Sequence, residues 1–273
     1  MIRTRGKMAF ATVVMALVAV IFIIPFYSMI MMSTHVNENL FKGIPLLPGG
    51  YLLKNIETVF AARFQNYYIN SLIVSTGATL LAVAVSTLTG YAFSMYKFRY
   101  SRQLFSFILI TMMVPAQLGL VAFVVEMKVL GWMNTFLPLI IPPAATGFGV
   151  YWMKNYIGGS LPGELLESAR IDGASEPRIL VSISLPCIMP AVFALGLMMF
   201  AANWNSFLVP LIVLNNVHTY TIPIGIITLN SAYRTDLAAR ITALSIGTLP
   251  LIAVYLACSK TFIRGLTMGA IKG

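Results

Sequence analysis

The residues of this chain that could do chemistry gather in one stretch, ELLESARIDGASEPRILVSISLPCIMP, which runs from Glu164 to Pro190. Four acids and two arginines lie between Glu164 and Arg178, in a chain of which only 10% is charged, and an apolar run follows at once. Carboxylate and guanidinium groups at this density form ion pairs and charge-assisted hydrogen bonds. The chemistry they offer is recognition of another charged surface.

The rest of the sequence lacks the groups that catalysis or metal binding would need. No phosphate-binding G-x-x-x-x-G-K-[ST] motif is present, so the chain cannot bind ATP by that route. His35 and His218 lie in separate predicted loops, where we expect them to be solvated, and Asp236 is the only acid near the last extracellular loop. Cys187 and Cys258 have no metal-type spacing and are expected to be reduced packing residues. We therefore predict no catalytic residue, no metal site and no cofactor in this chain.

The composition places the chain in a lipid bilayer. It has 273 residues and is 59% hydrophobic, more than one water-soluble core of this length would normally hold. A membrane-spanning helix needs about 20 apolar residues. Stretches of that length predict an all-α, polytopic membrane protein with a single transmembrane domain over 1–273. We expect six transmembrane helices, at about 8–32, 68–95, 104–126, 136–155, 182–212 and 241–262.

The basic residues orient these spans, because short cytoplasmic loops retain Lys and Arg. If the charge-free run 179–233 crosses the membrane once, both termini are cytoplasmic; if it crosses twice, the basic C-terminal end is misplaced. The first apolar stretch is interpreted as an uncleaved span rather than a secretory signal. Orientation also accounts for the net charge of +10, so we infer no nucleic-acid surface. The cytoplasmic basic residues are then Arg3, Arg5, Lys7, Lys97, Arg99, Arg102, Lys154, Arg170, Arg178, Lys260, Arg264 and Lys272.

The charged stretch therefore belongs to a cytoplasmic loop, at about 158–180, between the fourth and fifth spans. Its apolar residues are spaced as in a short amphipathic helix. Gly173 allows a sharp bend after that helix, and Pro177 favours the start of another. Two short helices at an angle form a knob that a partner protein can receive; the alternative is a loop that rests on lipid headgroups. The apolar residues are Leu161, Leu165, Leu166, Ala169 and Ile171.

At this point the loop resembles a known signature. The membrane subunits of ATP-binding-cassette (ABC) importers carry Glu-Ala-Ala, three residues, Gly, nine residues, Ile, one residue and Leu-Pro. The matching residues here are Glu167, Ser168, Ala169, Gly173, Ile183, Leu185 and Pro186, with Ser168 the single departure. The resemblance implies the type I ABC importer permease fold, and it makes these residues, with Asp172, the candidates for coupling to an ATPase.

Further stretches resemble the carbohydrate-importer branch, in particular the smaller permease of the maltose-transporter type. They are NSLIVSTGATLLAVAVSTLTGYAFS, LGWMNTFLPLIIP, NWNSFLVPLIVL and FIRGLTMGAIKG, and the likeness runs over nearly the whole chain. The resemblance implies a permease of the bacterial inner membrane that imports a sugar, a polyol or a glycerol phosphate. It also implies a second, different permease, two copies of a cytoplasmic ATPase that binds ATP and Mg²⁺, and an extracytoplasmic sugar-binding protein.

The implied mechanism is mechanical coupling, in which closure of the ATPase dimer drags the loop and the spans attached to it. We expect Glu167 and Asp172 to pair with basic groups of the ATPase, while Ala169 and Gly173 permit close approach. Pro186 and Pro190 loosen the following helix, either as a functional bend or only as a packing kink.

A sugar path needs polar groups at membrane depth. Asn203 and Asn205 are candidates, either for substrate contact or for hydrogen bonds between helices. Trp204 is a candidate for stacking on a sugar ring or for the aromatic belt. Gln117 and Tyr91 are secondary candidates.

The segment 215–236 is too short to cross the membrane. By resemblance it is the loop that reaches into the docked binding protein; the alternative is a re-entrant packing hairpin. Its candidate residues are Tyr220, Ile222, Pro223, Ile224 and Gly225. The basic end, 265–273, is either an ATPase contact or a stop-transfer tail.

Two other classes of protein compete with the importer permease. A stand-alone secondary transporter would carry ionisable residues within its spans and an internal repeat, and neither is visible here. A membrane-embedded enzyme would need a catalytic cluster, which is absent from the sequence.

A phosphorylated substrate would need arginines at the cavity, and Arg63, Arg234 and Arg240 are predicted near the outer face.

Overall fold

The computed structural model describes residues 2–229 and 236–270, so Arg234 and the last residues of the basic C-terminal end lie outside the described residues. It is 80% helical with no strand among the described residues, which confirms the all-α prediction. The α-helices are α1 (Ile2–Ser33), α2 (Asn37–Leu40), α3 (Leu52–Ala61), α4 (Phe64–Met95), α5 (Ser101–Met113), α6 (Leu120–Val129), α7 (Leu137–Ile140), α8 (Gly147–Ser160), α9 (Gly163–Ile171), α10 (Glu176–Arg178), α11 (Leu185–Trp204), α12 (Leu208–Val213), α13 (Ile222–Thr228) and α14 (Leu237–Ala270). Three 3₁₀ turns, η1 (Ala116–Gly119), η2 (Pro142–Ala144) and η4 (Val217–Thr219), and a π-helical turn, η3 (Ile179–Ser184), complete the order.

Four stretches of helix are long and apolar enough to cross a membrane by themselves. They are Phe10–Ser33, Phe64–Met95, Glu176–Trp204 and Leu237–Cys258. A fifth candidate is the pair Ser101–Met113 and Ala116–Val129, bent by 87°. The bend follows from Pro115, which lacks an N–H and forces Val114 into an extended conformation with ψ 120°.

The region of the fourth predicted span, 136–155, is divided among α7, η2 and the 14-residue α8. Pro138, Pro142 and Pro143 lie in its first half and interrupt the ladder of helical hydrogen bonds. The count of six spans therefore stays a prediction.

The chain divides into two compact units, and the first comprises Met1–Tyr68 and Ile224–Leu249. Its core joins Leu40 to Ala238 and Ile241. The Asn55 side chain donates to the carbonyl oxygens of Ser33 and His35, at 2.8 and 2.9 Å. The Asp236 carboxylate accepts the Ala239 N–H at 2.9 Å, so it caps the start of α14.

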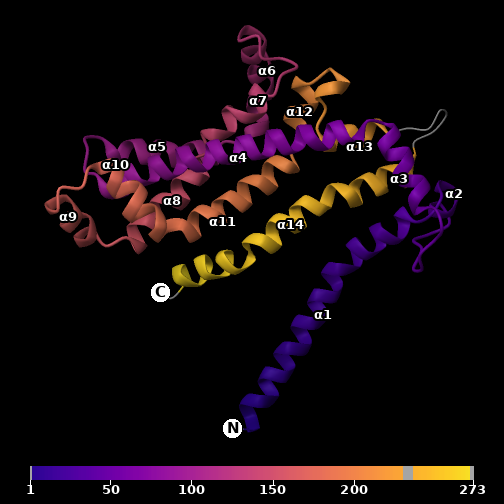
Figure 1. Cartoon of the computed structure of the whole chain (residues 1–273), viewed down its shortest axis with the longest axis horizontal. Coiled ribbons are helices and arrows are strands. Elements are labelled where there is room, and N and C mark those ends of the chain that lie inside the picture. The colour runs from indigo at the N-terminus through magenta and orange to yellow at the C-terminus, as the bar shows by residue number, and fades with distance from the viewer. Residues whose placement is uncertain (1, 230–235, 271–273) are drawn as a thin grey trace. The chain divides into compact units, whose positions relative to one another are not determined.

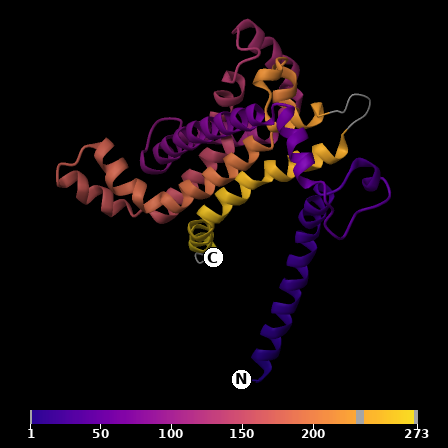
Figure 2. The same ribbon diagram turned by 45° about the vertical axis from the view of Figure 1, so that its right-hand side comes forward.

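The second unit comprises Ile69–Pro223 and Pro250–Gly273, and in it α4, α5, α8 and α11 lie side by side (Figure 1). Two glycines bring α4 and α8 together. A Cβ at Gly90 would lie 2.6 Å from Met153 Cβ, and a Cβ at Gly149 would lie 2.2 Å from Ser86 Oγ. The Trp152 indole N–H donates to the Ala191 carbonyl at 3.2 Å and ties α8 to α11. At one end of these helices α9 and α10 project as a knob, visible in both ribbon views (Figure 2).

The Gly90 contact predicts a steep cost for one methyl group. Gly90→Ala should destabilise the protein by about 1–3 kcal/mol, because the new Cβ meets backbone as well as side chain on α8. The matched control is Gly196→Ala on α11, where the new Cβ would lie 3.9 Å from Val83 Cγ2, an ordinary contact. We expect the midpoint of thermal unfolding in detergent to fall for Gly90→Ala and to hold or rise for Gly196→Ala. Equal midpoints would show that α4 and α8 do not pack this closely.

Candidate functional site: the loop between α8 and α11

The helix α9 presents one face to the chain and the other to solvent. Leu166 is only 2% exposed and Ala169 is buried beside it, whereas Ile171 is 86% exposed. The buried pair is three residues apart, which places both side chains on one face of the helix. The amphipathic helix predicted from the sequence is therefore present.

Gly173 ends α9 as the sequence predicts. Its φ is +79°, in the left-handed region that disfavours every residue with a Cβ. The Ala174 N–H donates to the Ala169 carbonyl and the Gly173 N–H to the Arg170 carbonyl, both at 3.0 Å, which is the Schellman pattern of hydrogen bonds. No atom lies within 4 Å of a Cβ built on Gly173, so its backbone conformation, rather than space within this chain, requires glycine.

The second half of the signature forms the junction with α11. Ser175 precedes α10 and Pro177 lies in its first turn, as predicted. Ile183 lies in the π-helical turn η3, and Leu185 begins α11. Pro186, in the first turn of α11, has no N–H to offer the regular ladder, which accounts for an irregular turn just before it.

The underside of α9 rests on a hydrophobic cluster that several helices share. Ala169 lies in this cluster, so its small size lets α9 approach the chain's own core, whereas we expected it to serve the approach of a partner. Tyr91, predicted as a secondary sugar-path residue, also lies here and lines neither of the cavities described below. The buried residues of the cluster are Tyr91, Met153, Ile157, Leu161, Leu166, Ala169, Ile179, Ile188, Ala191 and Leu195.

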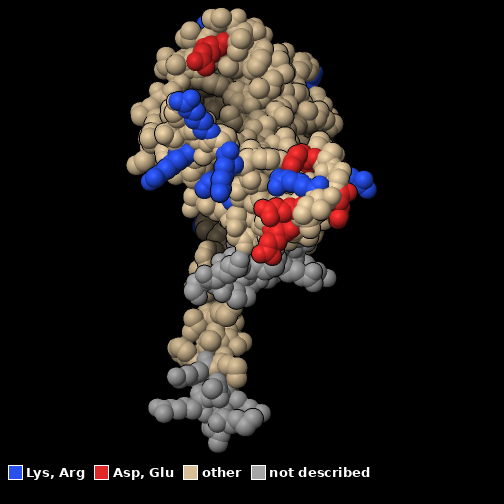
Figure 3. All heavy atoms as spheres, turned by 90° about the vertical axis from the view of Figure 1, so that its left-hand side faces the viewer, with Lys and Arg blue, Asp and Glu red and all other residues tan. Residues whose placement is uncertain are grey.

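The outer side of the knob carries exposed acids. Glu164, Glu167 and Asp172 are all exposed. The Ser168 hydroxyl donates to the Leu165 carbonyl at 3.0 Å, so this departure from the signature is satisfied within α9. Figure 3 shows acidic and basic side chains gathered at the end of the second unit that carries the knob and the α4–α5 connection. That connection and the first turn of α5 contribute the exposed bases Lys97, Arg99 and Arg102.

A hydrogen-bonded trio, which the sequence did not reveal, ties the knob to α4. The Tyr96 hydroxyl donates to Glu176 Oε2 at 2.5 Å, and Arg170 Nε donates to Glu176 Oε1 at 2.7 Å. The bond to Glu176, with a smaller effect of burial, raises the pKa of Tyr96 to about 12, so the phenol keeps its proton at physiological pH. The Tyr96 ring also meets the Tyr91 ring edge to face, 5.9 Å between centroids. Nothing in the spacing of Tyr96 and Glu176, 80 residues apart, indicates this contact.

The structure separates the predicted sugar-path residues. Asn203 lines a cavity of 450 Å³, whereas Asn205 and Gln117 line another of 360 Å³. Each asparagine donates to a carbonyl of its own helix, Asn203 to Met199 and Asn205 to Ala201, both at 2.9 Å. Trp204 is buried and stacks on Phe200, 5.5 Å between centroids, so it does not present a free face to a sugar.

The described part of the predicted binding-protein loop is fixed by hydrogen bonds and by buried side chains. The Asn70 side chain donates to the carbonyl oxygens of His218 and Tyr220, at 2.8 and 2.9 Å. Ile222 and Ile224 are buried, and a Cβ at Gly225 would lie 2.1 Å from the Tyr67 ring. Tyr220 and Pro223 are half-buried. Residues 230–235 of this segment lie outside the described part of the chain.

The arrangement of the knob suits recognition of another protein. Among the described residues no group of three or more His, Cys, Asp or Glu side chains could hold a metal ion. What the knob combines is an anchored apolar underside, a rigid turn at Gly173 and an outward acidic face, which suit a protein-docking element.

Comparisons with known proteins agree on one family. Residues 82–267 match the family described as the binding-protein-dependent transport system inner membrane component. The arabinooligosaccharides transport system permease protein AraQ of Halalkalibacterium halodurans is 30% identical over 96% of this chain and 95% of its own. The trehalose/maltose transport system permease protein MalG of Thermococcus litoralis is 33% identical over 94% of each.

A solved structure supports the fold. A chain of a bacterial ABC transporter involved in the import of the acidic polysaccharide alginate has a TM-score of 0.76 at 21% identity, over 94% of this chain and 97% of its own. The projecting loop between α8 and α11 lies within the matched residues 82–267. The chain therefore belongs to the family of binding-protein-dependent transport system inner membrane components, the permease subunits of ABC importers.

Proposed function

We propose that this chain imports a sugar as one of two permease subunits of an ATP-driven transporter. The observation that carries the proposal is the knob: the signature residue Glu167 and the nearby Asp172 are exposed, on and just after a helix whose underside is packed into the core of the second unit. The names of its relatives, which transport arabinooligosaccharides or trehalose and maltose, support a carbohydrate as the substrate.

The partners follow from this role. The second permease is a different but related chain, two copies of an ATPase bind ATP and Mg²⁺ on the cytoplasmic side, and a sugar-binding protein docks on the opposite face. Both termini of this chain are cytoplasmic, in the inner membrane of a bacterium. ATP hydrolysis belongs to the separate ATPase, and this chain takes no cofactor of its own. The candidates for the binding-protein loop are Tyr220, Ile222, Pro223, Ile224 and Gly225.

The knob couples the ATPase to the spans. A cleft of the ATPase receives α9, and acids at Glu167 and Asp172 pair with basic groups there. Leu166 and Ala169 belong to the same buried cluster as residues of α8 and α11, so a displacement of α9 moves those helices with it. The trio of Tyr96, Glu176 and Arg170 carries the same displacement to α4. Asn203, Asn205 and Gln117 are candidates for the sugar path, whereas Trp204 and Tyr91, which the sequence also suggested, line neither cavity.

Reversing the outward charges tests the docking role. The double variant Glu167→Arg, Asp172→Arg should weaken co-purification of the ATPase roughly tenfold or more and abolish ATP-dependent uptake, with insertion into the membrane unchanged. The matched control is Glu57→Arg, an exposed acid on α3 in the first unit, which should leave both unchanged. Normal uptake by the double variant would contradict the assignment of the knob.

The trio of Tyr96, Glu176 and Arg170 predicts a variant that still binds the ATPase but transports less sugar. Tyr96→Phe removes only the hydroxyl that donates to Glu176, so the ATPase should still bind while less sugar is moved for each ATP hydrolysed. Folding stability should change by less than about 1 kcal/mol, because the network is exposed. Tyr100→Phe, an exposed tyrosine of the same connection, is the control. The check is the ratio of sugar taken up to phosphate released in proteoliposomes; equal ratios for the two variants would exclude a role of the trio.

A further inference from the structure

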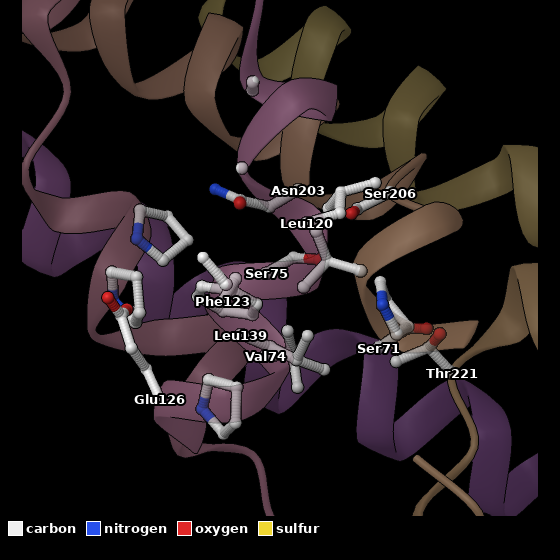
Figure 4. Close-up of a pocket in the computed structure, with 18 residues that line it drawn as sticks. Ser71, Val74, Ser75, Leu120, Phe123, Glu126, Leu139, Asn203, Ser206 and Thr221 are labelled. Carbon is white, nitrogen blue, oxygen red and sulfur yellow. The ribbon is translucent and has the colours of Figure 1, made fainter. Parts of the chain in front are cut away.

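The cavity beside α4 has the construction of a small-molecule site. Its volume is 450 Å³, and its walls come from α4, the bent pair of η1 and α6, the proline-rich α7 and η2, and the segment from Asn203 to Thr221 (Figure 4). Most of the lining is apolar, with a few polar side chains among it, which is the usual composition of ligand pockets of roughly 300–1,000 Å³.

Two hydroxyl groups in this lining have no hydrogen-bond partner among the described residues. Ser75 is 1% exposed and Thr221 is 4% exposed, and neither hydroxyl has a hydrogen-bond partner in the part of the chain that the structure describes. A buried polar group without a partner is costly and calls for a ligand, a water molecule or another polar group. Both hydroxyl oxygens are shielded, so contact with a ligand in the cavity requires rotation about the Cα–Cβ bond, and this rotation breaks no hydrogen bond among the described residues.

The wall that carries Thr221 is firmly held. The Ser71 hydroxyl on α4 accepts the Ile222 N–H at 2.8 Å, and the Asn70 amide donates to the Tyr220 carbonyl at 2.9 Å. Thr221 lies between these two anchored positions, and Figure 4 shows it beside Ser71. The two unpaired hydroxyls are thus presented by a fixed helix and by a fixed loop.

The charge of the cavity lining limits which classes of ligand can bind. Glu126 contributes a carboxylate on the side of the cavity opposite Thr221, and no Lys or Arg is among the described lining residues. A carboxylate accepts hydrogen bonds from ligand hydroxyls and repels a phosphate or a second carboxylate. The Phe123 ring and the prolines offer apolar surface for the C–H faces of a ring.

We propose that this cavity binds a neutral, hydroxyl-rich ligand, a sugar ring or a polyol, through Ser75, Thr221, Asn203 and Glu126, and that it rejects phosphorylated and acidic sugars. The inference rests on the proposed function and deepens it, since it assigns part of the substrate contact to this chain rather than to its partner permease. It also separates this chain by substrate charge from the structurally similar importer of the acidic polysaccharide alginate.

Direct binding to the assembled permease–ATPase complex, in lipid nanodiscs and without the binding protein, tests the site. The probes are two neutral sugars, maltose and lactose, and one phosphorylated compound, sn-glycerol 3-phosphate. The binding of each is measured by saturation-transfer NMR. We expect a neutral sugar to bind, and Ser75→Ala and Thr221→Val each to weaken its binding by about threefold to tenfold, the value of one hydrogen bond. The control is Ser86→Ala, another buried and unpartnered hydroxyl on α4 that does not line the cavity; it should leave binding unchanged.

A second variant tests the effect of the negative charge at Glu126. Glu126→Gln keeps a carbonyl acceptor but removes the negative charge, so the neutral sugar should bind more weakly and sn-glycerol 3-phosphate should now compete with it. Equal binding of sn-glycerol 3-phosphate and the neutral sugars by the unchanged protein, or no effect of Ser75→Ala and Thr221→Val, would overturn the proposed site. If the same complex, supplied with its binding protein, still performs ATP-driven sugar uptake in those cases, the proposed function stands. Failure of every sugar to be taken up would instead overturn the proposed function.

Discussion

The close backbone contact between α4 and α8 is the constraint on which the second unit depends. In lipid, the hydrophobic effect contributes little to the association of apolar helices, because lipid tails are as apolar as the side chains. Close packing and polar contacts must therefore hold the helices together. Gly90 and Gly149 supply that closeness, because neither position has room for a Cβ. The neighbours of these glycines, Tyr91 on α4 and Met153 on α8, then form part of the cluster on which α9 rests. The position of the knob therefore depends on the close packing of α4 against α8.

This arrangement explains why the same loop can be both exposed and rigid. The outer acids Glu167 and Asp172 have no anchoring role, so they are free to meet a partner. The anchoring falls to Leu166 and Ala169 beneath them, and the Schellman turn at Gly173 fixes the direction in which the chain leaves α9. An interface whose recognition residues are separate from its anchoring residues can bind and release without disturbing the packing below.

Local signals predicted much of this site, and contacts distant in sequence account for what they missed. Gly173 and Pro177 act on their immediate backbone, so the turn and the second short helix could be predicted from residue type alone. Hydropathy alone predicts one span over 136–155, but the prolines at 138, 142 and 143 interrupt it, and the region is a broken segment ending in a short α8. The trio at Tyr96 and the cavity between Ser75 and Thr221 join residues far apart in the chain, which no spacing rule brings together.

The helix α4 connects the two ends of the proposed mechanism. It carries Ser71 and Ser75 at the cavity and Tyr91 under the knob, and Tyr96 follows its last residue. Ser75 and Tyr91 are about 24 Å apart along the axis, at about 1.5 Å per residue. No proline interrupts α4, whereas α11 contains Pro190 and follows the π-helical turn η3. In the proposed mechanism, a displacement of the knob would therefore pass along α4 as along a straight rigid helix, whereas α11 would bend at its start as it moves. In this mechanism the cavity wall formed by α4 would move with the knob, so closure of the proposed ATPase partner would change the site at the far end of the same helix.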